Sequence, residues 1–181
     1  SLLFLWLAAL IAMSFLYCQA RILQAARGIP AWREPALLAL IVVTGLAEGA
    51  GLLALASPML AGSPGREVAV PLLVLVVLRY AMSRRYTRRI AAPGNAPLKT
   101  VRALRETDRQ FLLLGHYFPA ALLVIGFFVG GSFGTALLAL AGVAVTAGGW
   151  LFKLALLSRI ASTQGFALQL VPARTPGYAL P

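Results

Sequence analysis

The sequence predicts an all-α fold, a polytopic integral membrane bundle with about five transmembrane helices. Hydrophobic residues make up 60% of the 181 residues, and only 12% are charged, whereas a soluble domain carries about 25% charged residues. The apolar residues also fall into runs that approach the roughly 20 residues an α-helix needs to cross the hydrocarbon core. Finally, the cations gather between alternate runs, as they do in multi-pass membrane proteins.

The apolar runs place the spans in the first 157 residues, which we expect to form one bundle. The predicted spans are residues 2–20, 35–61, 68–82, 111–129 and 133–157. The third run is the shortest, and Arg79 lies near its end. A long cationic side chain at that place is expected to snorkel to the headgroups and lengthen the span.

The charges between the runs predict the topology. The first connection carries Arg21, Arg27 and Arg33, and a long loop over residues 83–110 carries most of the other cations, whereas the remaining connections are nearly uncharged. By the positive-inside rule, both basic connections and the C-terminal tail at residues 158–181 are cytoplasmic. Within the basic loop, "APGNAP" is a break, and "LKTVRALRETDRQ" after it is expected to form a short helix that runs into the fourth span.

Glu48, within "TGLAEGAGLL", is a carboxyl in the middle of a predicted span. A carboxyl costs about 2.5 to 3.5 kcal/mol at mid-bilayer, so it must face protein or a wet cavity, and it is expected to be protonated when isolated. Gly45 and Gly49 bracket it at GxxxG spacing, which lets another helix approach the same face. Glu48 is therefore either a neutral hydrogen-bonding group in a tight helix contact or a group that handles protons near a quinone.

His116 and Lys153 are the other ionisable candidates within spans. His116 lies little more than a turn inside the fourth span, where it is either a structural hydrogen-bonding group or an imidazole that exchanges protons with a quinone carbonyl. Lys153 lies one turn before the end of the fifth span, and it is expected to snorkel, with an active role as the alternative.

Several function classes are disfavoured by what the sequence lacks. Cys18 is the only cysteine and His116 the only histidine, so the chain by itself supplies no iron–sulfur cluster, thiolate zinc site or bis-histidine haem. It has no nucleophile elbow, Walker loop or HExxH motif, which disfavours a self-contained hydrolase or ATPase. The cations also lack the aromatic interleaving of a nucleic-acid surface.

The long basic loop has two readings. Topology and anionic lipid account for much of its charge, and docking of an acidic soluble partner is the alternative. The candidate docking residues are Arg84, Arg85, Arg88, Arg89, Arg102 and Arg105.

The stretch "YCQARILQAARGIPAWREPALLALIVVTGLAEGAGLLAL", and within it "ARGIPAWREP", resembles the DMSO-reductase anchor or NrfD-like (polysulfide reductase) membrane subunits. With the tail motif "QGFALQLVPARTPG", the similarity is closest to the membrane subunit of phenylacetyl-CoA:acceptor oxidoreductase-type molybdoenzymes. The resemblance covers much of the chain. The tail continues with "QL" where relatives have a proline, which is a departure from the pattern.

This resemblance implies an anchor of about eight helices, of which these spans correspond to the later ones, in a bacterial or archaeal cytoplasmic (inner) membrane. Its partners are a four-cluster iron–sulfur subunit and a molybdopterin (Mo or W) catalytic subunit, and its substrate is menaquinone or ubiquinone. The quinol-site residues of such anchors lie largely in earlier helices, so their roles do not transfer to Glu48 or His116. Two rivals stay open: a transporter that uses Glu48 for ion or proton coupling, and an assembly anchor without a quinone site.

Overall fold

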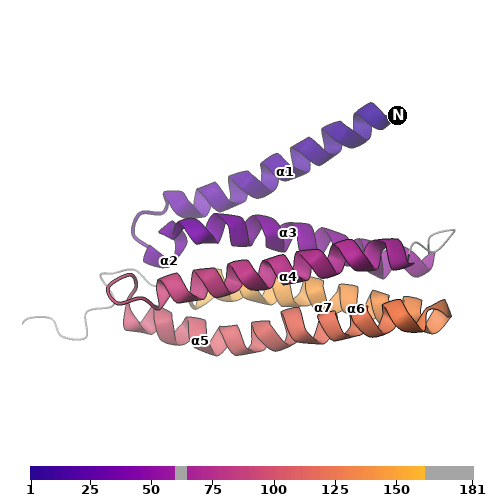
Figure 1. The fold of residues 1–181 in the computed structure, drawn as a ribbon. Helices are drawn as coiled ribbons and strands as arrows, with labels where there is room; N and C mark the ends of the chain where they lie inside the picture. The colour runs from indigo at the N-terminus through magenta and orange to yellow at the C-terminus, as the bar shows by residue number, and fades with distance from the viewer. Residues whose placement is uncertain (60–64, 162–181) are drawn as a thin grey trace, which may run out of the picture.

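The computed structural model describes residues 1–59 and 65–161, and all regular structure in them is helical (Figure 1). In chain order the elements are α1 (Leu2–Ala25), α2 (Pro30–Arg33), α3 (Pro35–Ala56), the 3₁₀ turn η1 (Ser57–Met59), α4 (Gly65–Ile90), α5 (Leu98–Leu112), the π-helix η2 (Leu113–Tyr117), α6 (Phe118–Val129) and α7 (Gly131–Ser158). The all-α prediction is confirmed. Residues 162–181, which include most of the predicted tail and its family-like motif, lie outside the described residues.

Four helical segments are long and apolar enough to cross a membrane, which indicates a membrane-embedded protein. They are Leu2–Ala25, Pro35–Met59, Leu98–Val129 and Gly131–Ser158. The remaining predicted span lies in α4, which is long enough but is not among them, because Arg79 and the charges near its two ends keep any long stretch of it from being apolar. A fifth span therefore stays a prediction.

Prolines and glycines mark the boundaries of the central helices. Pro35 begins α3, and the preceding Glu34 accepts a hydrogen bond from the backbone N–H of Ala36 at 3.3 Å, which caps the helix. At the other end of the bundle, Gly130 and Gly131 have φ angles of +65° and +60° and form the tight turn from α6 to α7. Residues other than glycine rarely adopt such angles, so this turn depends on both glycines.

The segment predicted as a basic loop, residues 83–110, is mostly helical. Helix α4 continues to Ile90, a short turn follows, and α5 returns from Leu98, which confirms the predicted short helix that runs into the next span. Arg84 joins the two arms through an ion pair with Asp108, at 2.8 Å between Nη1 and Oδ2. We call residues 83–112 the α4–α5 hairpin.

Long-range hydrogen bonds gather the helix ends on the side of the hairpin, which we call the basic end. Tyr86 of α4 donates from its hydroxyl to the carbonyl of Ala31 in α2 at 3.0 Å, and Trp32 donates from Nε1 to the carbonyl of Leu156 in α7 at 3.2 Å. Burial first, and then the charge of Glu34, raises the pKa of Tyr86, so its hydroxyl stays protonated and able to donate.

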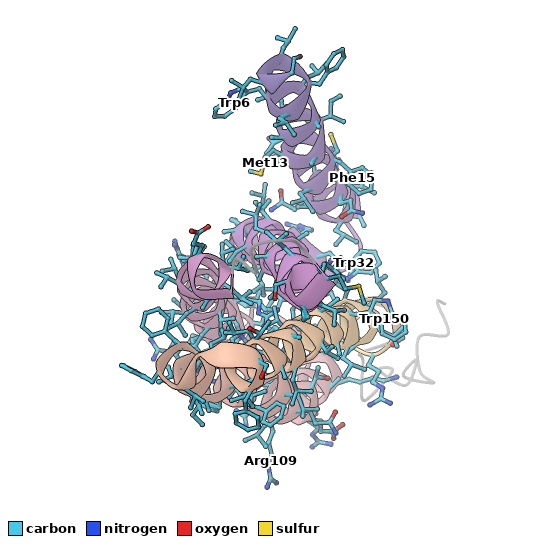
Figure 2. All side chains as sticks on the ribbon, turned by 90° about the vertical axis from the view of Figure 1, so that its right-hand side faces the viewer. Trp6, Met13, Phe15, Trp32, Arg109 and Trp150 are labelled. Carbon is cyan, nitrogen blue, oxygen red and sulfur yellow. The ribbon has the colours of Figure 1, made fainter. Side chains whose placement is uncertain are left out.

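Helix α1 stands apart from the other helices along its first half. Its second half approaches α3, where Leu16 lies against Gly45, whereas Trp6, Met13 and Phe15 lie on the part that stands clear of the bundle (Figures 1 and 2). Residues 2–15 are all exposed, and the first buried residue of α1 is Ala20. The surfaces that α1 and α3 turn toward each other are therefore open over much of their length.

Glycines let α7 approach its neighbours at backbone distance. A Cβ atom added to Gly142 of α7 meets the carbonyl oxygen of Gly51 in α3, and one added to Gly148 meets the Cα of Gly115 in η2. The predicted Gly45/Gly49 face does not act as one contact, because Gly45 lies against Leu16 of α1 and Gly49 faces open space. Helix α7 instead contacts α3 through Gly51, one turn beyond Glu48.

We expect Gly142→Ala to lower the stability of the bundle by about 1 to 3 kcal/mol, because the added methyl group forces the backbones of α3 and α7 apart. Gly49→Ala is the matched control, since its Cβ meets nothing within 4 Å and alanine favours the helix by up to about 1 kcal/mol. Thermal unfolding of both variants in mild detergent tests this. A melting temperature of Gly142→Ala that equals or exceeds that of Gly49→Ala would contradict the close packing of α3 against α7.

Candidate functional site

Glu48 and Lys153 form an ion pair across the contact between α3 and α7. Lys153 Nζ lies 2.5 Å from Glu48 Oε2, and the two side chains are 28% and 16% exposed, respectively. Gly149, one turn before Lys153, leaves room for the carboxyl, because a Cβ at that position would collide with Glu48 Oε1. The carboxyl that the sequence showed as isolated therefore has a cation beside it.

This geometry corrects the expectation that Lys153 snorkels to the headgroups. Side chains in an α-helix point toward its N-terminus, so the Lys153 side chain leads back along α7 into the bundle, where it meets Glu48. In a low-dielectric interior, a nearby opposite charge offsets part of the cost of burying each group. Glu48 lies in a tight helix contact, which forms at Gly149 of α7 and not through the predicted Gly45/Gly49 face, and its partner is a charged side chain.

Arg79 is fully buried, which corrects the expectation that it snorkels. Its Nη1 donates to the carbonyl of Val145 in α7 at 3.0 Å, and its Nη2 donates to the carbonyl of Gly115 in η2. The guanidinium carbon lies 5.4 Å from the ring centroid of Phe111, a cation–π contact. Arg79 thus connects α4 to α7 and to the π-helix from inside the bundle.

The sequence of η2 explains why Arg79 is needed there. Pro119 has no N–H, so the carbonyl four residues earlier, that of Gly115, loses its ordinary helical partner. The backbone widens into a π-helix over Leu113–Tyr117, a form often found at functional sites. A carbonyl without a partner is costly in a membrane interior, and the Arg79 guanidinium supplies the missing donor.

His116 is held inside the same π-helix. Only 2% of it is exposed, and its Nδ1 lies 2.9 Å from the carbonyl oxygen of Phe111. Because a carbonyl can only accept, Nδ1 carries the proton, and Nε2 is the acceptor of a neutral ring. Nε2 is buried and has no hydrogen-bond partner among the described residues. Tyr80 and Phe111 pack edge-on against the ring, with centroids 5.8 and 4.5 Å away.

Together, Glu48, Arg79, His116 and Lys153 form what we call the polar layer. Adjacent residues of α7 bring its parts together, because Gly148 contacts Gly115, next to His116, and Gly149 contacts Glu48. Three polar atoms of the layer are buried without a partner among the described residues: Glu48 Oε1, Arg79 Nε and His116 Nε2. Since nearly all buried polar atoms in proteins are hydrogen-bonded, such a cluster is typical of a site that holds water or a ligand.

The six candidate docking arginines lie on the α4–α5 hairpin at the basic end. Arg84 is paired with Asp108, and Arg89 Nη1 lies 3.6 Å from Glu34 Oε1, so both contribute to the fold. The other four are exposed and form no ion pair with a described residue: Arg85, Arg88, Arg102 and Arg105. Arg109 lies at the edge of the bundle far from α1 (Figure 2).

Within residues 1–59 and 65–161, no group of three His, Cys, Asp or Glu side chains could hold a metal ion. Cys18 is exposed on α1. The role of Arg79 is the feature that sequence reasoning missed. Two residues in the sequence could have indicated this role. Pro119 leaves one carbonyl in a membrane helix without a donor, and Arg79 is the one arginine of an apolar run whose side chain faces that carbonyl.

Comparison with known proteins finds no matching family model, no curated protein and no solved structure. The similarity to molybdoenzyme anchors therefore stays a prediction from the quoted motifs.

We expect Lys153→Met to cost on the order of 3 kcal/mol, because it leaves the partly buried Glu48 carboxylate without its cation. The double variant Glu48→Gln/Lys153→Met removes both charges together and should recover much of that loss. Melting temperatures of the wild-type, single and double variants in detergent give the coupling energy. Additive losses would show that the contact between Nζ and Oε2 contributes nothing.

We expect Arg79→Lys to lower stability by about 1.5 to 3 kcal/mol, because an ammonium is a point donor and does not reproduce a planar fork that serves two carbonyls. Arg85→Lys on the same helix is the control, since Arg85 is exposed and has no ion pair with a described residue. Thermal unfolding compares the two. Equal melting temperatures would contradict the bridging role of Arg79.

Proposed function

We propose that this chain is the membrane anchor and quinone-interacting subunit of a multi-subunit iron–sulfur molybdoenzyme-type oxidoreductase. In this role it passes electrons between an iron–sulfur partner subunit and the membrane quinone pool. The polar layer is the observation that carries the proposal, because ionisable groups inside membrane helices are costly and mark paths for protons, ions or substrates. The quoted motifs supply the enzyme class.

Quinone reduction needs protons as well as electrons, and the polar layer suits their supply. An iron–sulfur cluster of the partner would supply two electrons to the quinone, and two protons would be taken up to convert its two carbonyls to hydroxyls. The Lys153 ammonium donates to Glu48 Oε2 and carries protons that can be exchanged, and His116 offers a buried, unpartnered Nε2 that can accept a proton. The role proposed for these residues is proton exchange with the quinone.

The basic end supports docking of the partner. The α4–α5 hairpin presents four arginines, Arg85, Arg88, Arg102 and Arg105, that form no ion pair with a described residue. An exposed positive surface attracts an acidic partner and orients it. By the positive-inside rule this surface lies in the cytoplasm, so we propose that the iron–sulfur and catalytic subunits bind there.

A transporter is the second candidate, and the Glu48–Lys153 pair is the observation that favours it. A partly buried carboxylate that exchanges a lysine partner for a transported cation can couple ion binding to transport, and Arg79 lies close enough to influence Glu48 electrostatically. The two candidates differ in whether the chain requires a metal-containing partner.

Purification from the native membrane through a tag on this chain tests the proposal. We expect a cluster-rich subunit to co-purify, with iron and either molybdenum or tungsten in stoichiometric amounts by metal analysis. In that complex, Glu48→Gln and His116→Ala should lower quinone-linked turnover by about tenfold or more, because each loses a proton-exchanging group. The control is Leu140→Ala, on the exposed side of α7. Arg105→Gln does not serve as a control, because Arg105 lies in the proposed docking surface.

A metal-free chain that purifies alone would contradict the anchor proposal and favour the transporter. If the complex assembles and its quinone-linked turnover is unchanged in both Glu48→Gln and His116→Ala, the chain is an assembly anchor without a quinone site.

A further inference from the structure

An apolar groove opens toward the lipid between α1, α3 and α7, near the basic end. Its volume is about 250 Å³, and Ile22 and Leu23 of α1, Ile41 of α3 and Leu157 of α7 line it. Ile22 and Leu157 are exposed by 71% and 53%, so the groove has an open mouth, whereas Ile41 is buried at its base. Nearly all of the lining is hydrocarbon, which suits a ligand that arrives through the bilayer.

Two polar side chains stand in this apolar wall, Lys153 and Gln19. Lys153 links the groove to the polar layer, because the same ammonium that lines the groove donates to Glu48 Oε2. An ammonium carries three N–H donors, and Glu48 is the one described residue to which Lys153 donates. Donors therefore remain for an acceptor in the groove.

The groove lies along the second half of α1, where this helix approaches α3 and α7. Near the basic end α1 lies close enough to pack Leu23 against the core, whereas its first half stands away from α3. The contact of Leu16 with Gly45 closes the gap between α1 and α3, and the groove lies on the C-terminal side of that contact along α1, with exposed Ile22 and Leu157 at its mouth. A ligand that enters through this mouth head first brings its polar group to the Lys153 ammonium, which lines the groove.

We propose that this groove binds the ring of a membrane quinone, with a ring carbonyl accepting a hydrogen bond from Lys153 and the isoprenoid tail leaving through the mouth at Ile22 and Leu157 toward the bilayer. The inference rests on the proposed function and deepens it by placing the ring. The volume lies just below the roughly 300 to 1,000 Å³ of sites that enclose a drug-sized ligand. The groove therefore fits a ring-sized group whose tail stays outside.

The placement gives Lys153 two roles in one reaction. Two electrons from the proposed iron–sulfur partner and two protons would convert the two quinone carbonyls to hydroxyls. Lys153 donates to one carbonyl oxygen and passes it one proton, becoming a neutral amine, and the second proton comes from water; Glu48 stabilises the ammonium before the transfer, and a further proton from water re-forms it afterwards. In this scheme Glu48 takes part in proton exchange through Lys153 and not by contact with the quinone, because it does not line the groove.

Photo-crosslinking tests the groove. The tagged protein, with the chains that co-purify with it, is reconstituted in phosphatidylcholine nanodiscs and illuminated with azido derivatives of decyl-benzoquinone and decyl-naphthoquinone. Peptide mass spectrometry should locate the label within residues 19–23 or 153–157. An excess of the unlabelled quinone should reduce this labelling by about tenfold or more, as expected for a site that saturates.

A pair of matched variants sharpens the test. Leu157→Trp fills the mouth of the groove and should reduce labelling there at least about fivefold, whereas Leu140→Trp, at a position with 48% exposure on the same helix outside the groove, should leave it unchanged. The double variant Glu48→Gln/Lys153→Met should weaken labelling without the unfolding expected of Lys153→Met alone. Melting temperatures verify that each variant is folded.

The outcomes separate the groove from the proposed function. Label confined to other residues, or groove labelling that unlabelled quinone does not suppress, overturns the groove while quinone-linked turnover of the complex still supports the function. A complex that neither binds the probes nor turns over quinone overturns both.

Discussion

The close approach of α7 to its neighbours is the constraint on which the centre of this bundle depends. Inside a membrane there is no hydrophobic force that drives one helix against another, so association relies on packing and on interhelical hydrogen bonds. Gly142, Gly148 and Gly149 bring the backbone of α7 against α3 and against the π-helix. Because these contacts leave no room for side chains, they also set which polar groups of the neighbouring helices meet.

The polar layer follows from that packing and from the absence of water. Two cations, Arg79 and Lys153, lie near one carboxylate, Glu48, so the layer carries more positive than negative charge when all three are ionised. In a medium of low dielectric constant, such an excess favours a nearby acceptor or an electron-rich ring. The cation–π contact of Arg79 with Phe111 and its bonds to two carbonyls offset part of this charge from inside the protein.

Much of the fold was predictable because length and hydropathy alone identify membrane helices. Residues 2–20, 35–61, 111–129 and 133–157 each lie almost wholly within helical structure of the described chain, and the short helix after "APGNAP" forms as α5. The candidate site was harder to predict. Glu48, His116 and Lys153 were recognisable as unusual residues in apolar runs, but the pairing of Glu48 with Lys153 joins positions 105 residues apart, and no local pattern encodes it.

Arg79 shows why the remainder was missed. A cation near the end of an apolar run is ordinarily placed at the headgroups, because that position costs little. Here a proline on a different helix creates a carbonyl that needs a donor, and the benefit of satisfying it exists only once the two helices are packed. Such a preference depends on tertiary structure and not on the sequence around Arg79.

The open mouth of the groove beside α1 has a consequence for how this protein meets any lipid-soluble molecule. Because exposed Ile22 and Leu157 open the groove sideways into the hydrocarbon, the molecule reaches it by diffusion in two dimensions, without first entering water. Occupancy is then governed by the mole fraction of that molecule among the membrane lipids. Its apparent affinity, expressed as an aqueous concentration, would change with the amount of lipid present even though nothing in the protein had changed.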